Sequence, residues 1–98
     1  MKTKSQVIDM LRVNEAFIRS YGVRRLGVFG SVARGEQHSK SDVDLLVDFQ
    51  KGNKTFDNFI NLVFFLEELL DCQVELVTTE SLSPYIGPRI LEEVEYVS

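Results

Sequence analysis

The segment VDLLVDF, residues 43–49, constrains the fold more than any other part of this chain. Its strict alternation is typical of a β-strand, in which successive side chains point to opposite faces. One face carries only apolar residues and predicts burial, namely Val43, Leu45, Val47 and Phe49. The other face carries Asp42, Asp44, Leu46 and Asp48, so the strand begins with an acidic pair beside an apolar run.

Apolar spacing predicts the other elements. We expect helices over residues 5–21, from Ser31 onward for about one turn, over 56–70, and from Pro88 through Val97. Two more strands are expected over 25–29, ended by Gly30, and over 72–78. The order predicts one α/β or α+β unit that spans residues 1–98 as a single domain.

Composition narrows the classes of function. The net charge of −4, from 15 acidic and 11 basic residues, argues against general nucleic-acid binding, which needs a basic surface. No apolar run is long enough to predict a membrane span. Cys72 has no partner cysteine, so we expect a cytoplasmic protein in which this thiol fills the core. The sequence is compatible with an oligomer.

Gly30 and Ser31 form a candidate phosphate site. Glycine permits a tight turn after the strand and lets a ligand approach the backbone. The Ser31 hydroxyl and the free amides of the following turn could hold a triphosphate. The alternative is that Ser31 simply caps a surface helix.

Asp42 and Asp44 form a candidate metal site. They are two residues apart on a strand, so their carboxylates point to the same side and repel each other. Hard carboxylate oxygens suit Mg²⁺, which would relieve that repulsion. The alternative is an edge strand whose acids serve solubility and prevent edge pairing.

Glu75 is a candidate third carboxylate, because it is the one acid in the apolar run VELV. If its strand neighbours residues 43–49, Glu75 can reach Asp42 and Asp44. Three carboxylates beside a phosphate site suit nucleotidyl transfer with two Mg²⁺ ions, and Glu75 would hold the ion nearest the nucleophile or act as its base. The alternative is an exposed glutamate on a half-buried strand.

Four other polar side chains lie in or near the same region. Arg34 and Lys40 are close enough in sequence to assist phosphate binding, although such residues often only solvate a loop. His38 has no second histidine or cysteine at ligand spacing and is expected to be exposed. Asp48 is roughly 13 Å along the strand from Asp44, so we expect a structural role for it.

The stretch GSVARGEQHSKSDVDLLV resembles the signature of the minimal nucleotidyltransferases of the DNA-polymerase-beta-like superfamily: Gly-Ser, a short helix with Ala-Arg-Gly, then Ser-Asp-x-Asp-Leu. The resemblance covers essentially the whole chain. It implies an α+β fold with a small mixed sheet backed by helices. It also implies that Gly30 and Ser31 bind the triphosphate of ATP and that Asp42 and Asp44 bind Mg²⁺.

The resemblance further implies a protein partner. Minimal members are typically encoded with HEPN-domain toxins, act as their antitoxins, and can transfer AMP from ATP to a toxin tyrosine. The family commonly has aspartate where this chain has Glu75, whose extra methylene moves the carboxylate. Two other functions therefore stay open: a binding module that blocks its partner without catalysis, and a nucleic-acid 3′-end nucleotidyltransferase, which the acidic charge disfavours.

Overall fold

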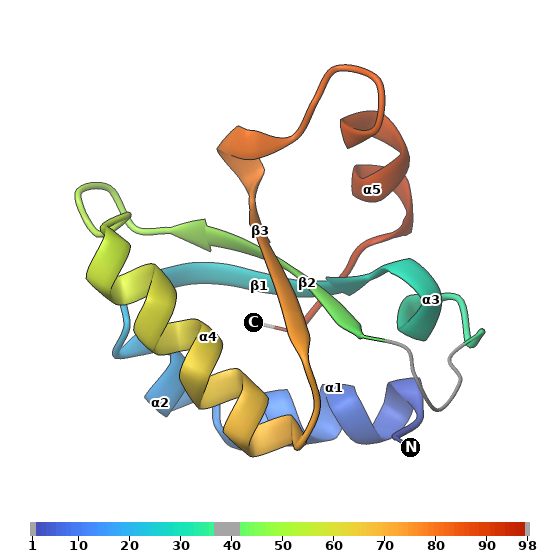
Figure 1. Ribbon diagram of the computed structural model, residues 1–98, viewed down its shortest axis with the longest axis horizontal. Coiled ribbons are helices and arrows are strands. Elements are labelled where there is room, and N and C mark those ends of the chain that lie inside the picture. Colours follow the sequence, from blue (N-terminus) through green and yellow to red (C-terminus); the bar gives the residue numbers. More distant parts are fainter. Residues whose placement is uncertain (1, 37–41, 98) are drawn as a thin grey trace.

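The computed structural model describes residues 2–36 and 42–97 and contains one mixed sheet with helices around it (Figure 1). Its elements follow one another as α1 (Lys4–Val13), α2 (Glu15–Arg19), β1 (Val23–Phe29), α3 (Gly30–Ala33), β2 (Val43–Phe49), α4 (Phe56–Leu70), β3 (Val74–Thr78), a 3₁₀ turn η1 (Thr79–Ser81), α5 (Gly87–Glu93) and β4 (Glu95–Tyr96). The expected α+β fold with a small mixed sheet is confirmed.

The strands lie in the order β3-β2-β1-β4. β1 pairs antiparallel with both β2 and β4, whereas β2 pairs parallel with β3 through the connecting helix α4. In Figure 1, α1, α2 and α4 gather along one side of the strands, while α5 lies away from them beside α3. The two halves of the predicted site, on α3 and at the start of β2, are therefore on the α5 side.

The core lies between the sheet and the helices α1, α2 and α4. The alternating residues of β2 are buried as the sequence predicted, and α4 turns Leu62, Leu66 and Leu70 towards them. Because α4 has a leucine at every fourth position, these side chains lie on one face of the helix, which the sheet buries. Cys72 packs against this core in a partly buried position, and burial raises the pKa of its thiol.

The first helix is shorter than expected because Asn14 interrupts it. The Asn14 side-chain amide donates to the Met10 carbonyl at 2.8 Å, and its backbone leaves the helical region. Asparagine competes for backbone hydrogen bonds in this way, which makes it a poor residue for a helix interior. The chain then forms the short helix α2 before Gly22, whose φ of +85° marks the turn into β1.

The prediction of a helix through Val97 is wrong. α5 ends at Glu93, Val94 is extended, and β4 pairs with Gly27 and Val28 of β1. A Cβ on Gly27 would lie 2.5 Å from a Val94 methyl, so only glycine allows this approach. The partner of β4 is far away in sequence, which local periodicity could not reveal.

Among the residues that the structure describes, no helix is both long enough and apolar enough to cross a membrane. The third strand also begins two residues later than expected, at Val74 rather than Cys72. This later start of the strand moves no residue of the candidate site to another element.

Candidate active site

The parallel pairing of β2 with β3 brings two predicted site residues together. Asp44 and Glu75 are direct partners in the register of these strands. Both side chains therefore leave the sheet on the same face, as the sequence predicted for neighbouring strands. Asp44 is half-buried, and Glu75 is exposed at the edge of the sheet.

The Asp44 carboxyl is in an unfavourable electrostatic position. Its pKa is raised to about 6, most of all by burial and then by the hydrogen bond and charge of Glu75 and the charge of Asp42. Arg34 lowers the pKa but does not offset the other effects. Among the described residues, Arg34 is the cation that acts on this carboxyl, and it does not neutralise the negative charge at this edge of the sheet.

Gly30 lies in the predicted phosphate-binding turn and contacts the acidic pair that Asp44 forms with Glu75. Its φ is +74°, a conformation that residues with a Cβ rarely adopt. A Cβ built on Gly30 would also overlap the carboxylate of Asp44. Gly30 is thus required twice, once for the backbone and once for the approach of Asp44.

Ser31 lies in the second position of α3, not at its cap. The N-cap is Phe29, whose own side chain makes no capping hydrogen bond. The interpretation of Ser31 as a capping residue is therefore not supported. Ser31 is partly exposed and follows Gly30 directly in the turn.

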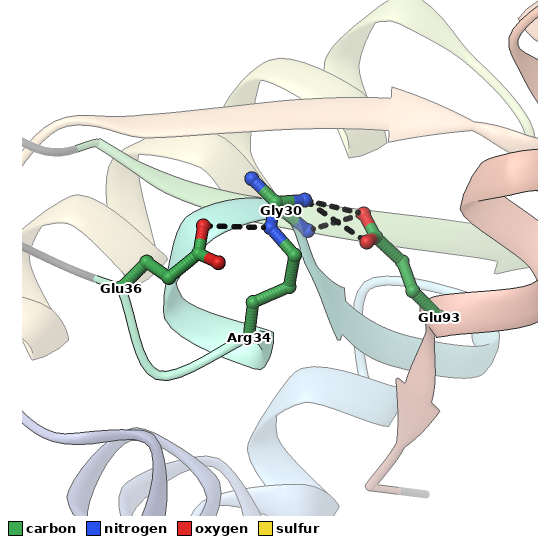
Figure 2. Close-up of polar contacts among 4 residues, drawn as sticks. All are labelled: Gly30, Arg34, Glu36 and Glu93. Atoms are coloured by element: carbon green, nitrogen blue, oxygen red, sulfur yellow. Dashed lines mark hydrogen bonds and ion pairs between the residues drawn. The ribbon is translucent and has the colours of Figure 1, made fainter.

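Glu93, which the sequence analysis missed, contacts the same turn from α5 (Figure 2). Its Oε1 accepts a hydrogen bond from the Gly30 amide at 2.9 Å. Both carboxylate oxygens also accept from Nη1 of Arg34, at 3.2 and 2.9 Å. Gly30 and Glu93 are 63 residues apart in sequence, and the helix expected through Val97 gave Glu93 no distinctive position.

Arg34 is held by two carboxylates. Its Nε donates to Glu36 at 3.0 Å while Nη1 contacts Glu93, and these hydrogen bonds, led by that of Glu36, raise the pKa of the guanidinium (Figure 2). Arg34 is therefore beside the Gly30 turn, as expected of a phosphate-binding residue, but its hydrogen-bond acceptors in this structure are the protein's own carboxylates.

Two hollows open on this side of the molecule. One, of about 510 Å³, is lined by Gly30, Arg34 and Glu93, and the other, of about 380 Å³, by Asp44 and Glu75. They share a wall made of Phe29, Ile86 and Ile90. The predicted phosphate turn and the carboxylates of Asp44 and Glu75 thus line neighbouring hollows that share a wall.

The remaining predicted residues are placed differently. Asp42 is exposed just before β2 and acts on Asp44 through its charge. Asp48, at the far end of β2, forms an ion pair with Arg24, which agrees with a structural role. Lys40 and His38 lie outside the described residues.

A divalent cation fits the donor set chemically. Asp44 and Glu75 offer hard oxygens, and a cation would relieve the repulsion that raises the Asp44 pKa. Within residues 2–36 and 42–97, no three acidic, histidine or cysteine side chains are close enough to form a complete ligand group. The protein alone therefore supplies a partial coordination sphere, which the phosphates of a nucleotide would extend.

Comparisons with known proteins agree with this arrangement. Residues 10–97 match the family model described as a nucleotidyltransferase domain. The chain is 42% identical over 98 residues to the protein adenylyltransferase MntA of Thermococcus cleftensis, covering 99% of this chain and 98% of that protein.

Solved structures show the same fold. A candidate minimal nucleotidyltransferase superposes with a TM-score of 0.74 at 37% identity, covering 90% of this chain and 93% of that one. A chain of a toxin–antitoxin structure with AMP-PNP gives a TM-score of 0.66 at 26% identity, covering 99% of this chain and 73% of that one. Fold, signature residues and relatives lead to one conclusion: this chain belongs to the minimal nucleotidyltransferases, the family that includes MntA.

Proposed function

We propose that the protein transfers AMP from ATP to a tyrosine hydroxyl of a HEPN-type toxin and so acts as an antitoxin. Mg²⁺ would be held by the predicted ligands Asp42, Asp44 and Glu75 only when the phosphates of ATP complete its coordination sphere. One observation carries this proposal. Asp44 faces Glu75 across β2 and β3 and lies against Gly30, so the predicted metal ligands adjoin the predicted phosphate turn.

The chain supplies three groups to the reaction. The turn at Gly30 and Ser31, with Arg34, orients the triphosphate. Lys40 remains a prediction as a further phosphate ligand. The acidic pair holds Mg²⁺, which when bound neutralises charge on the phosphates and in the transition state.

The reaction itself is a substitution at the α-phosphorus. The acceptor oxygen forms a bond to that phosphorus, and the bond to the bridging oxygen of the β-phosphate breaks, which releases pyrophosphate. The hydroxyl proton passes to a carboxylate, for which Glu75 is the candidate because it is exposed at the edge of the sheet. Because ATP is the donor, we place the reaction in the cytoplasm.

The acceptor surface is proposed to lie around the start of α5. Tyr85 and Ile86 are 88% and 59% exposed, and Ile86 lines both hollows. A protein docked on these apolar side chains would present a hydroxyl close to the acidic pair. A relative named as a protein adenylyltransferase and a neighbour from a toxin–antitoxin structure support such an acceptor.

The test is transfer of label from ATP carrying ³²P on its α-phosphate. Purified protein, Mg²⁺ and source-cell lysate should give a labelled band, which mass spectrometry would identify as a HEPN toxin modified on tyrosine. The Asp42→Asn/Asp44→Asn variant should give none, and EDTA should abolish labelling of the unaltered protein.

Asp48→Asn is the matched control for this test. It makes the same kind of substitution and removes one carboxylate charge from the same face of β2, at the end where Asp48 contacts Arg24. It should label the acceptor as the unaltered protein does. Equal loss in both variants would contradict the assignment of the metal site to Asp42 and Asp44.

A second candidate, favoured by Glu75 in place of the family's aspartate, is an antitoxin that blocks its partner by binding alone. Glu75→Asp separates the two. A weak enzyme should keep its labelling or increase it, since the shorter carboxylate restores the common ligand. A protein that only binds should inhibit its toxin with no label transferred by either form.

A further inference from the structure

The contact between Glu93 and the Gly30 turn places an anion where the proposed function requires a phosphate (Figure 2). The same carboxylate accepts from the Gly30 amide at 2.9 Å and from the Arg34 guanidinium at 2.9 and 3.2 Å. These donors come from the start and end of one tight turn, and the acceptor comes from α5. Glu93 therefore bridges the two donor groups as a ligand would.

We propose that Glu93 is an internal competitor of the nucleotide, whose carboxylate ATP must displace from Gly30 and Arg34 in order to bind. The inference rests on the proposed function, because that function assigns both donors to the triphosphate. It adds a residue, not part of the predicted site, that sets the affinity for the nucleotide.

Two anions cannot accept from the Gly30 amide at the same time. A backbone amide has one hydrogen, and that of Gly30 is directed at Glu93. A phosphate oxygen at the same place would also lie next to a negative carboxylate, which is repulsive at this range. Hydrogen bonds between charged partners are the stronger kind, so displacing Glu93 opposes nucleotide binding.

The carboxylate is ionised in the described contact. Desolvation raises the pKa of Glu93, but the hydrogen bonds from Gly30 and Arg34 outweigh it and hold the pKa below its ordinary value. Its side chain is 27% exposed and faces the 510 Å³ hollow. Space for the displaced side chain thus exists beside the contact.

Arg89 provides a place for the displaced carboxylate. It lies four residues before Glu93 on α5, lines the same hollow, and its charge already acts on Glu93. Residues four apart on a helix are neighbours, so Glu93 can exchange Arg34 for Arg89 without a change in the helix. Arg34 is then free to meet the phosphates.

The test is equilibrium binding of AMP-PNP in the presence of Mg²⁺ to the unaltered protein and to Glu93→Gln. Glutamine keeps an oxygen that accepts from Gly30 but loses the charge that competes with phosphate. We expect Glu93→Gln to bind AMP-PNP about five- to tenfold more tightly, since a charge-assisted contact becomes a neutral one. Inorganic triphosphate, used as a competitor, should gain by the same factor, because the effect concerns phosphates and not the base.

Glu92→Gln is the matched control, because Glu92 adjoins Glu93, lines the same hollow and carries the same charge. It should change the affinity for AMP-PNP by less than about twofold, as expected of a screened surface charge. Arg89→Gln should weaken AMP-PNP binding in the unaltered background and have no effect in Glu93→Gln, because the displaced carboxylate is then absent. Thermal melts establish that each variant is folded.

Several results would overturn the inference. Weaker binding by Glu93→Gln would mean that Glu93 holds the turn in the form that binds phosphate. Equal gains in Glu92→Gln and Glu93→Gln would reduce the effect to net charge, and unchanged affinity would remove it. If the unaltered protein binds AMP-PNP, these results leave the proposed function standing, whereas binding by neither form would contradict both.

Discussion

The two ends of β2 carry aspartates on the same face of the sheet, yet their surroundings differ. Asp48 forms an ion pair with Arg24 and accepts a hydrogen bond from Thr79 at 3.5 Å. Asp44 instead faces Glu75, and its pKa is raised to about 6 by burial and by neighbouring carboxylates. One strand thus contains a carboxylate neutralised by an ion pair, which serves the fold, and one whose ionised form its described neighbours disfavour, which is typical of a functional site.

The largest effect should come from Gly30, which allows Asp44 its position. In Gly30→Ala the new Cβ would be strained by the φ of +74° and would overlap the Asp44 carboxylate. We therefore expect the free energy of unfolding to fall by about 2–4 kcal/mol and AMP transfer to be lost. Gly35 has a similar φ of +72° with nothing nearby, and Gly35→Ala should cost about 1 kcal/mol. Urea unfolding measures both, and equal losses would mean that the contact with Asp44 is unimportant.

Mg²⁺ binding should distinguish the two aspartates next. At a concentration 100 times the dissociation constant, the ion should stabilise the unaltered protein and Asp48→Asn by about 2.7 kcal/mol. Asp44→Asn should gain almost nothing, because it loses the half-buried ligand. Thermal melts with and without Mg²⁺ provide the measurement, and a full gain in Asp44→Asn would place the ion elsewhere.

The metal-free protein should show the opposite preference. Between the ordinary pKa of 3.8 and about 6, the folded state holds more protons at Asp44 than the unfolded state does. Stability therefore falls as pH rises through this window, and the ionised carboxylate penalises the fold at pH 7. Asp44→Asn in EDTA should then be more stable by about 1 kcal/mol at pH 7, allowing for screening by solvent, and should show a flatter pH profile.

The result to set against this prediction is a less stable Asp44→Asn at pH 7 in EDTA. In that case the pair would contribute to the fold, and the contrast with Asp48 would disappear. Asp48→Asn, measured in parallel, reports the effect of the same substitution where the charge is neutralised.

The smallest effect should be at the Asp48 end. Arg24 is largely exposed, so its pairing with Asp48 should contribute less than about 1 kcal/mol. A double-mutant cycle with Arg24→Gln and Asp48→Asn measures this coupling. A coupling of several kcal/mol would show that the fold depends on Asp48 much more strongly than an exposed ion pair allows, and the contrast between the two ends of β2 would have to be revised.

Local patterns were enough to predict much of this structure. β2 and α4 have the expected bounds, because alternation and helical spacing report directly on which residues are buried. The pairing of Asp44 with Glu75 also followed from alternation, once the two strands were taken as neighbours. The comparisons bear out the family that the signature around Gly30 indicated.

What local patterns missed depends on contacts between distant residues. The sequence near Glu93 suits a helix, and only the partner strand β1 makes β4 extended. The role of Glu93 follows from where α5 is placed, not from its neighbours in sequence. Asn14 is a local signal for the end of a helix, but the helical spacing of the apolar residues around it led us to predict one continuous helix.

Gly27 has a consequence for how substitutions in this protein should be interpreted. It touches no group of the site, yet Val94 and Tyr96 lie against the place where its side chain would be. Those residues fix the end of α5, and thereby the reach of Glu93 to Gly30. A bulkier residue at Gly27 would therefore change nucleotide binding indirectly, by displacing the end of α5. A screen of variants would score this position as functional although Gly27 takes no part in the chemistry.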